Sequence, residues 1–341
     1  MYIQYSGDIK KISIFYWRLR RHFRFLVRHL NFRRAVNAII FFAEMKFKKV
    51  YLRSYPPYIR IETSPYCNLR CPGCLLGETF YNEANPEHRD AGFMSYDLFV
   101  DSVKDFVPYL LKINLYDEGE PLLNKNILKM IKYLSSNNVA TNISTNFSLN
   151  LSEEKLNEIV DCGLEQIVIC LDGSTQETYS KYRVGGDLNK VLQNLKKLSE
   201  INYNKKGKLK IDVQFIDFDD DEKERTAVYN LVKDLKIWRL SIIQGSSRKG
   251  RSGLKFTGTP DERRAKGCYE LWTSVIINSK GELGTCDYGE DNGIQNIGEA
   301  RNYKKDNLRN HPVLVELRQS FKYPDVPLNE ICCHCCEYLK K

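Results

Sequence analysis

Three cysteines, Cys67, Cys71 and Cys74, follow one another at a C-x3-C-x2-C spacing. Three thiolates can bind three irons of a [4Fe–4S] cube and leave the fourth iron open, whereas a closed cluster or a structural zinc site takes four protein ligands. An open iron can bind a reagent, so the spacing predicts a reactive iron–sulfur site. A zinc knuckle or a chance spacing is the alternative interpretation of this loop by itself.

The cysteine loop directly follows an expected strand at residues 59–63 and resembles the cluster loop of the radical S-adenosylmethionine (SAM) superfamily. The resemblance implies that SAM chelates the open iron. It further implies that an electron from the cluster cleaves SAM to a 5'-deoxyadenosyl radical, which abstracts hydrogen from a substrate. The cofactor carries the difficult chemistry and the protein positions it. A reducing partner such as flavodoxin or ferredoxin is implied as well.

Polar segments at three further strand ends resemble the SAM-binding segments of this superfamily. The segment 117–121 resembles the GGEP motif, with Glu118 in place of the first glycine, and would hold the SAM amino group. Residues 144–146 would reach the SAM carboxylate or ribose, and an arginine would pair with the carboxylate, a task that suits a guanidinium. The residues implied to bind SAM are Gly119, Glu120, Pro121, Ser144, Asn146, Asp172 and Arg183.

Two positions depart from the superfamily pattern. Gly73 stands where an aromatic or bulky residue is common, so the adenine of SAM must find its apolar contact elsewhere. Cys170 stands where serine is usual, and a thiol beside a radical could donate a hydrogen atom, as in radical epimerases that resemble this superfamily. A small buried cysteine that acts as a hydrophobe is the favoured interpretation of Cys170.

A second cysteine set lies in the last third of the chain. An expected hairpin, with strands at 271–277 and 283–285, separates two of these cysteines. Two ligands from the hairpin and one of two overlapping C-x2-C pairs would complete a four-cysteine site. The arrangement resembles a SPASM domain in its short Twitch form and implies one auxiliary [4Fe–4S] cluster; a zinc site is the alternative. The candidate ligands are Cys268 and Cys286 with either Cys332/Cys335 or Cys333/Cys336.

Strands and helices alternate between these motifs. Helical patterns near 95–108, 124–136, 152–162, 187–201 and 222–235 separate strand patterns at 59–63, 112–116, 140–145, 166–171, 209–215 and 237–243. Such alternation predicts an α/β fold with a parallel sheet and external helices. Length alone leaves a doubly wound sheet open. The resemblance favours a partial (β/α)6 TIM-type barrel with its catalytic groups at the carboxyl ends of the strands.

The barrel is expected at residues 58–245, between an N-terminal basic helical extension at 1–57 and a small C-terminal region. That region, residues 246–341, would contain a linker and the Twitch-like hairpin and cluster domain. Residues 1–60 hold fourteen Lys or Arg against two acidic residues, and the whole chain has a net charge of +9. Positive charge is therefore mainly a property of the extension.

Apolar residues at helical spacing predict two basic amphipathic helices within the extension, at residues 15–30 and 36–47. Such helices suit an anionic membrane surface or an anionic or lipid-linked substrate. Alternatively they only cap the barrel, with their apolar stripe buried and their arginines in solvent. No recognised nucleic-acid motif is present, so no nucleic-acid partner is expected.

Composition bears on the compartment. No apolar run approaches the roughly 20 residues of a membrane span, and the N-terminus lacks the apolar core of a signal peptide. Eleven cysteines, some of them adjacent, would be a hazard under oxidising conditions. The sequence therefore predicts a cytoplasmic protein, and peripheral contact with the membrane through the basic extension is the alternative.

The predicted function is radical SAM cleavage followed by hydrogen abstraction from a substrate C–H bond. An auxiliary cluster could accept the remaining electron in a two-electron oxidation, and similarity to Twitch enzymes favours a sugar-like, aminocyclitol or lipid-linked carbohydrate substrate. The alternatives are a peptide-modifying maturase, which cross-links a peptide or epimerises it through Cys170, and a non-catalytic zinc or iron–sulfur protein. For the base that oxidation requires, the candidates are Asp212, Gln214 and Glu270.

Overall fold

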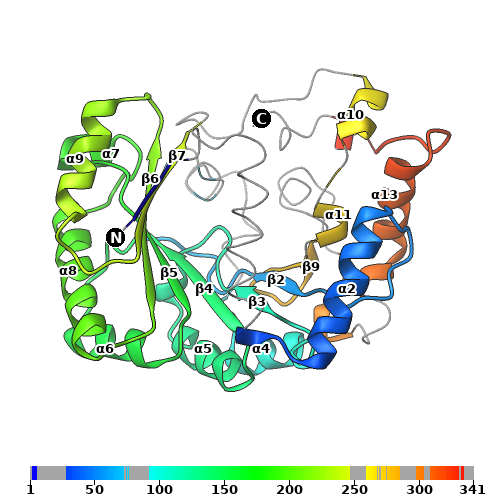
Figure 1. Ribbon diagram of the computed structural model, residues 1–341, viewed down its shortest axis with the longest axis horizontal. Helices are drawn as coiled ribbons and strands as arrows, with labels where there is room; N and C mark the ends of the chain where they lie inside the picture. The colour runs from blue at the N-terminus through cyan, green and yellow to red at the C-terminus, as the bar shows by residue number, and fades with distance from the viewer. Residues whose placement is uncertain are drawn as a thin grey trace.

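The computed structural model describes part of the chain, and Figure 1 shows its arrangement. A curved sheet forms the centre, and helices lie along its outer side. The described residues are 2–5, 28–72, 74, 76, 92–245, 259–266, 268, 270–273, 275–284, 297–302, 308–329 and 332–333.

The strands form one sheet in the order β1-β7-β6-β5-β4-β3-β2-β8-β9. All neighbours pair in parallel except β8 and β9, which are antiparallel. Among the described strands the sheet does not close on itself, which confirms the α/β fold with a partial barrel. The bounds are β1 Tyr2–Tyr5, β2 Tyr58–Ile61, β3 Lys112–Asn114, β4 Ala140–Thr145, β5 Gln166–Cys170, β6 Lys210–Asp217, β7 Arg239–Gln244, β8 Ile276–Ile277 and β9 Leu283–Gly284.

The helices expected between the strands are present, and several begin at side-chain caps. Ser95, Ser152 and Asp187 each accept a hydrogen bond from a backbone N–H of the first turn that follows, which satisfies a donor without a partner inside the helix. The barrel helices are α4 Tyr96–Val103, η2 Pro121–Leu123, α5 Ile127–Ser136, α6 Glu153–Asp161, α7 Gln176–Ser180, α8 Leu188–Asn204 and α9 Glu222–Val232. The others are α2 Phe32–Lys46, α10 Pro260–Lys266, α11 Glu270–Thr273, η3 Ala300–Asn302, η4 Leu308–Asn310 and α13 Pro312–Lys322.

The sheet buries apolar side chains against the helices and carries polar ones on its other face. In β2, Ile59 and Ile61 belong to the main apolar core, whereas Tyr58 and Arg60 are only partly buried. Successive strand residues point to opposite faces, so Arg60 and the following Glu62 face away from the helices. The polar face of the barrel therefore carries the candidate site.

Two local predictions are wrong. Residues 1–57 were expected to be helical, yet Tyr2–Tyr5 form strand β1 beside β7. The strand expected to start at Leu271 begins only at Ile276, and residues 270–273 form helix α11 instead. Leu271 and Trp272 are buried in a small apolar cluster outside the sheet, so their hydrophobicity serves packing between helices.

The second apolar cluster joins the N-terminal and C-terminal segments. It contains Leu52 together with Leu271, Trp272, Leu317 and Phe321. The indole N–H of Trp272 also donates to Lys49 O at 2.9 Å. Residues 28–57 and the described part of 246–341 thus pack on each other, although the predicted boundary at 57/58 coincides with the start of β2.

In helix α2, polar side chains are buried and several large apolar ones are exposed, the opposite of what was expected for the N-terminal extension. Its buried residues include Arg34, Asn37 and Glu44, while Phe32 and Ile39 are 86% and 70% exposed. For this helix, the prediction of a buried apolar stripe with arginines in solvent is wrong. None of the described helices is both long and apolar enough to span a membrane.

Candidate active site

The cluster loop follows β2 and lies against the loop that follows β3. Glu120 N donates to Tyr66 O at 2.8 Å, and Ser64 Oγ donates to the same carbonyl at 2.9 Å. At Gly119, a Cβ atom would stand 1.8 Å from Ser64 O. Only glycine permits this approach, so Gly119 has a steric reason to occupy its place in the motif.

Glu120 joins the end of β3 to the end of β4. Its buried carboxylate accepts hydrogen bonds from Thr145 Oγ1 at 2.7 Å, Asn146 N at 2.8 Å and Leu122 N at 3.1 Å. Burial raises the pKa of Glu120 to about 7, against the lowering effect of these hydrogen bonds. The carboxyl side chain therefore organises the site, and Pro121 begins the 3-10 helix η2 directly behind it.

Asn146 connects the end of β4 to the first cysteine. Its Nδ2 donates to Asn68 Oδ1 at 2.9 Å and lies 3.7 Å from Cys67 Sγ. Burial raises the pKa of Cys67 to about 12, and nearby Glu120, Cys71 and Cys74 add to the rise. The thiol is thus protonated in the metal-free protein, and iron binding would displace its proton.

Arg183 connects the second cysteine to the end of β5. Its Nε donates to Asp172 Oδ2 at 2.6 Å, and its Nη1 lies 3.6 Å from Cys71 Sγ. Burial opposes its charge, but Asp172 and the neighbouring thiols raise the pKa of Arg183 well above its ordinary value. Asp172 is fully buried and also accepts from Ile216 N at 2.7 Å. A fixed cation thus lies next to Cys71, one of the predicted cluster ligands.

Ser144 and Cys170 meet across β4 and β5. Ser144 Oγ and Cys170 Sγ are 3.6 Å apart. Burial is the main cause that raises the pKa of Cys170 to about 11. The Cys170 thiol is therefore protonated at neutral pH, as a hydrogen-atom donor must be, although a structural cysteine would be protonated as well.

The structure brings the predicted SAM-site residues together at the carboxyl ends of β2 to β5. Within the described residues, no three His, Cys, Asp or Glu side chains surround a common point suited to a single metal ion. A [4Fe–4S] cube does not require that arrangement, because each thiolate binds a different iron. Cys67, Cys71 and Cys74 are close enough to influence one another electrostatically, and this donor set fits the cluster. Gly73 lies outside the described residues.

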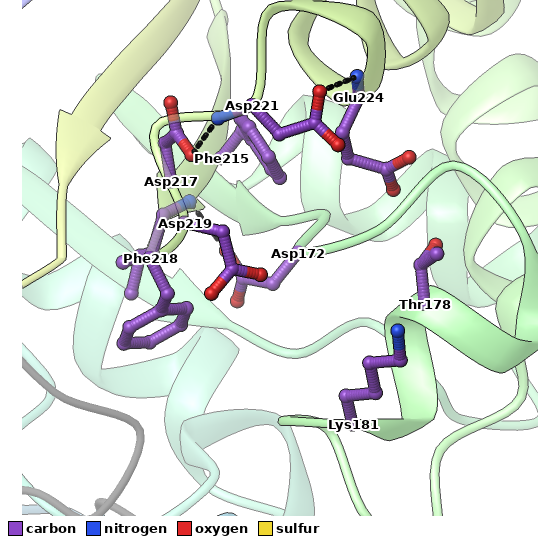
Figure 2. A pocket seen from close by; sticks show the side chains of 10 residues that line it. Asp172, Thr178, Lys181, Phe215, Asp217, Phe218, Asp219, Asp221 and Glu224 are labelled. Atoms are coloured by element: carbon purple, nitrogen blue, oxygen red, sulfur yellow. Dashed lines mark hydrogen bonds between the residues drawn. The ribbon is translucent and has the colours of Figure 1, made fainter.

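A pocket of ≈ 80 Å³ lies beside the Asp172–Arg183 pair (Figure 2). Thr178 on α7 and Lys181, the residue after α7, line one side of the pocket. Asp217, the last residue of β6, and Asp219, just beyond it, line the other side. Asp217 is an ion-pair partner of Arg225. This volume is below the roughly 300 Å³ of common ligand pockets, so the pocket by itself is too small for a ligand of the size of SAM.

The C-terminal cysteine set is described only in part. Cys332 belongs to the second apolar cluster, and Cys268 and Cys333 pack against that cluster. The carbonyl of Cys332 accepts from Arg263 Nε at 3.0 Å. Cys286, Cys335 and Cys336 lie outside the described residues, so the auxiliary cluster stays a prediction.

Among the predicted bases, Asp212 is enclosed by other side chains. Its carboxylate pairs with Arg239 and accepts hydrogen bonds from Gln166 Nε2 and Ser241 Oγ, all in the buried interior. Gln214 pairs in register with Cys170, and Glu270 opens α11.

Glu62 was missed by the sequence analysis. Its Oε2 accepts from Ser279 N at 3.3 Å. Burial, together with Asp117, raises the pKa of Glu62 to about 7. In the sequence, Glu62 could have been found only from its position two residues after Arg60, which places both on the same face of an expected strand.

Comparison with known proteins places this site in a family context. Residues 61–226 match the sequence model of the family described as "Radical SAM superfamily". GTP 3',8-cyclase of Clostridium botulinum (strain Hall) is 31% identical over 142 residues, which are 41% of this chain and 42% of that protein. The Clostridium perfringens (strain SM101) protein of the same name is 30% identical over 166 residues, 48% of this chain and 49% of that protein. The chain thus spans less than half the length of these curated relatives.

Two solved structures share the fold. Streptococcus suis SuiB has a TM-score of 0.58 at 15% identity, covering 91% of this chain and 80% of that one. The structure of "Native anSMEcpe with bound AdoMet and Kp18Cys peptide" has a TM-score of 0.50 at 16% identity, covering 78% and 82%. The cysteine loop, the polar strand ends and the family match agree: residues 61–226 match the radical SAM domain, whose superfamily consists of iron–sulfur enzymes.

Proposed function

We propose that this chain is an enzyme that cleaves SAM reductively and abstracts a hydrogen atom from a substrate C–H bond. The observation that carries the proposal is the approach of two polar side chains to cysteines of the cluster loop: Asn146, just after β4, to Cys67, and Arg183, after α7, to Cys71. One iron of a cluster held by Cys67, Cys71 and Cys74 would bind SAM and supply the electron for its cleavage.

The protein's own contribution is positioning and charge. The Arg183 guanidinium, fixed by Asp172, offers a cation for the SAM carboxylate next to Cys71. Asn146 and Ser144 present polar atoms from the end of β4 for the SAM carboxylate or ribose. Gly119 and Glu120 bring the backbone of the β3 loop against the cluster loop, where it can accept from the SAM ammonium.

The substrate forms the finer part of the proposal. A sugar-like, aminocyclitol or lipid-linked carbohydrate is favoured by the resemblance to Twitch enzymes, with the auxiliary cluster as electron acceptor. The protonated thiol of Cys170 supports a second candidate, a peptide epimerisation in which Cys170 returns a hydrogen atom. Replacing Cys170 by alanine would abolish an epimerisation and spare a dehydrogenation, as long as SAM cleavage persists. Mass and stereochemistry of the product distinguish these two results.

SAM cleavage tests the proposal directly. Anaerobically reconstituted protein with dithionite should form 5'-deoxyadenosine, and Cys71→Ala should abolish this product because one iron loses its ligand. Cys162→Ala is the matched control, because Cys162 is buried at the end of α6 and its thiol donates to Ile159 O within the same helix. Retained cleavage in Cys71→Ala, or loss in both variants, would contradict the assignment.

Iron and sulfide counts separate the two cysteine sets. Wild type should hold about eight irons, and the Cys67/Cys71/Cys74→Ala variant about four, if the auxiliary site also holds a [4Fe–4S] cluster. About four irons falling to none, with zinc present, would assign the C-terminal site to zinc.

A further inference from the structure

Helix α2 presents an apolar face to solvent. Phe32, Ile39 and Phe47 are 86%, 70% and 63% exposed, and Val36 and Ile40 are exposed between them. These positions recur at intervals of three, four and seven to eight residues, so they share one side of the helix. A soluble helix normally turns such a stripe inward, and a contiguous exposed stripe marks an interaction site.

The opposite side of α2 is fixed to the rest of the protein by polar contacts. Arg34 donates to Val107 O at 3.1 Å and to Asn137 O at 3.0 Å. Asn37 exchanges two hydrogen bonds with the backbone of Tyr55. Glu44 accepts from Ser54 Oγ and from two backbone N–H groups. Rotating α2 to bury its apolar side would break all these buried contacts, so the exposed orientation is built into the fold.

Basic side chains border the apolar face. Arg33 and Lys46 lie at its two margins on the helix, and Lys48, Lys49 and Arg53 are exposed beyond the helix, in a segment whose Val50 and Leu52 are buried. The one acidic residue between residues 28 and 57, Glu44, is buried. An apolar stripe flanked by cations complements a surface that offers acyl chains beneath negative headgroups.

We propose that the α2 face, defined by Phe32, Val36, Ile39, Ile40 and Phe47 with its basic border, binds an anionic lipid surface. The apolar side chains enter the headgroup–acyl boundary, and the lysines and arginines contact the negative headgroups. The barrel helices α6, α8 and α9 lie at the far side of the molecule from α2 (Figure 1), so binding through α2 leaves them away from the membrane. This inference does not depend on the reaction at the SAM site.

Vesicle sedimentation of the full chain tests the proposal. The protein should bind phosphatidylcholine vesicles that contain phosphatidylserine, and binding should weaken as salt rises. The combined variant Phe32→Gln, Ile39→Gln, Phe47→Gln should bind at least about tenfold more weakly, because it removes three large apolar contacts. The combined variant Lys46→Gln, Lys48→Gln, Lys49→Gln should lose about fivefold per charge. Tyr203→Gln is the matched control, since Tyr203 is 63% exposed on α8, and it should bind like wild type.

A second measurement does not require the triple variant to fold. The variant Ile39→Trp places a tryptophan on the α2 face. When anionic vesicles are added, its fluorescence emission should shift to shorter wavelength, and that of wild type should shift less. Absence of wild-type binding at low salt, equal binding of the apolar variant, or an unshifted emission would overturn the proposal. So would a concentration-dependent dimer that the apolar variant abolishes without any vesicle binding, because a second copy would then be the occupant.

Discussion

Gly119 lies where the loop after β3 touches the backbone of the cluster loop. A Cβ at this position would stand 1.8 Å from Ser64 O and 3.0 Å from Tyr66 O. Both obstacles are backbone atoms, so one loop must move. We expect Gly119→Ala to lower the free energy of unfolding by about 1–3 kcal/mol and to reduce iron incorporation, because the cysteines lie on the displaced loop. Urea unfolding of the apoprotein and an iron assay measure the two effects.

The matched control is Gly92→Ala, because nothing lies within 4 Å of a Cβ built at Gly92. This variant should unfold like wild type and bind the same amount of iron. If Gly119→Ala also behaved like wild type, the close contact of the two loops would be wrong.

At the scale of single residues, the sequence analysis could propose those positions whose role would depend on a local motif. The cysteine spacing, Gly119 and Arg183 fall into this group, and in the structure Arg183 lies 3.6 Å from Cys71. Glu62 could not be found in this way. Its environment depends on Ser279, which is distant in sequence and reaches Glu62 only because β8 pairs with β2.

At the scale of elements, β8 adds to the edge of the barrel sheet and makes stability depend on pH. The pKa of Glu62 rises in the folded protein to about 7, chiefly through burial and also through Asp117. The folded state therefore holds its proton more tightly than the unfolded state. The protonated Glu62 contributes fully to the free energy of unfolding at pH values below the pKa that Glu62 has in the unfolded chain. This contribution is lost as the pH rises through about 7, the pKa of Glu62 in the folded protein. Partial exposure of Glu62 makes roughly 3 kcal/mol an upper limit for this loss.

We expect Glu62→Gln to remove that loss, because a neutral amide still accepts from Ser279 N. The difference in free energy of unfolding between the variant and wild type should be near zero at about pH 4 and should favour the variant by about 1–3 kcal/mol at about pH 8. Denaturant unfolding across pH measures this difference. Glu200→Gln, on the exposed side of α8, should give a constant difference. A constant difference for Glu62→Gln too would refute a titrating contact between β2 and β8.

Elements with strong periodicity were predicted closely. The six barrel strands and five helices lie where the sequence placed them, because each carries its own apolar pattern and several carry a cap. Strand β1 and helix α11 were missed because their state depends on distant partners. β1 is a strand through its pairing with β7, and α11 takes its place from packing of Leu271 and Trp272 in the second apolar cluster.

At the scale of the whole molecule, two buried arginines connect the N-terminal and C-terminal segments. Arg318 Nε donates to Val50 O at 2.7 Å, and its Nη1 and Nη2 donate to Leu271 O and Arg309 O. Arg309 in turn donates to Ser54 and to Trp272 O. Burial lowers the pKa of Arg309 to about 9 and that of Arg318 to about 10. Both arginines act on backbone carbonyls of segments that are far apart in sequence.

We expect Arg318→Ala to loosen both segments at once, because three buried carbonyls lose a donor. Breaking a buried charged network typically costs about 3–5 kcal/mol, so amides of residues 49–54 and 271–273 should exchange hydrogen much faster than in wild type. Amides of β4 and β5 lie in the separate main core and should keep their exchange rates. Arg301→Ala is the control, since Arg301 forms an exposed pair with Glu299. Equal acceleration in β4 and β5 would show that the terminal segments and the barrel unfold as one unit, and hydrogen exchange followed by mass spectrometry distinguishes the two outcomes.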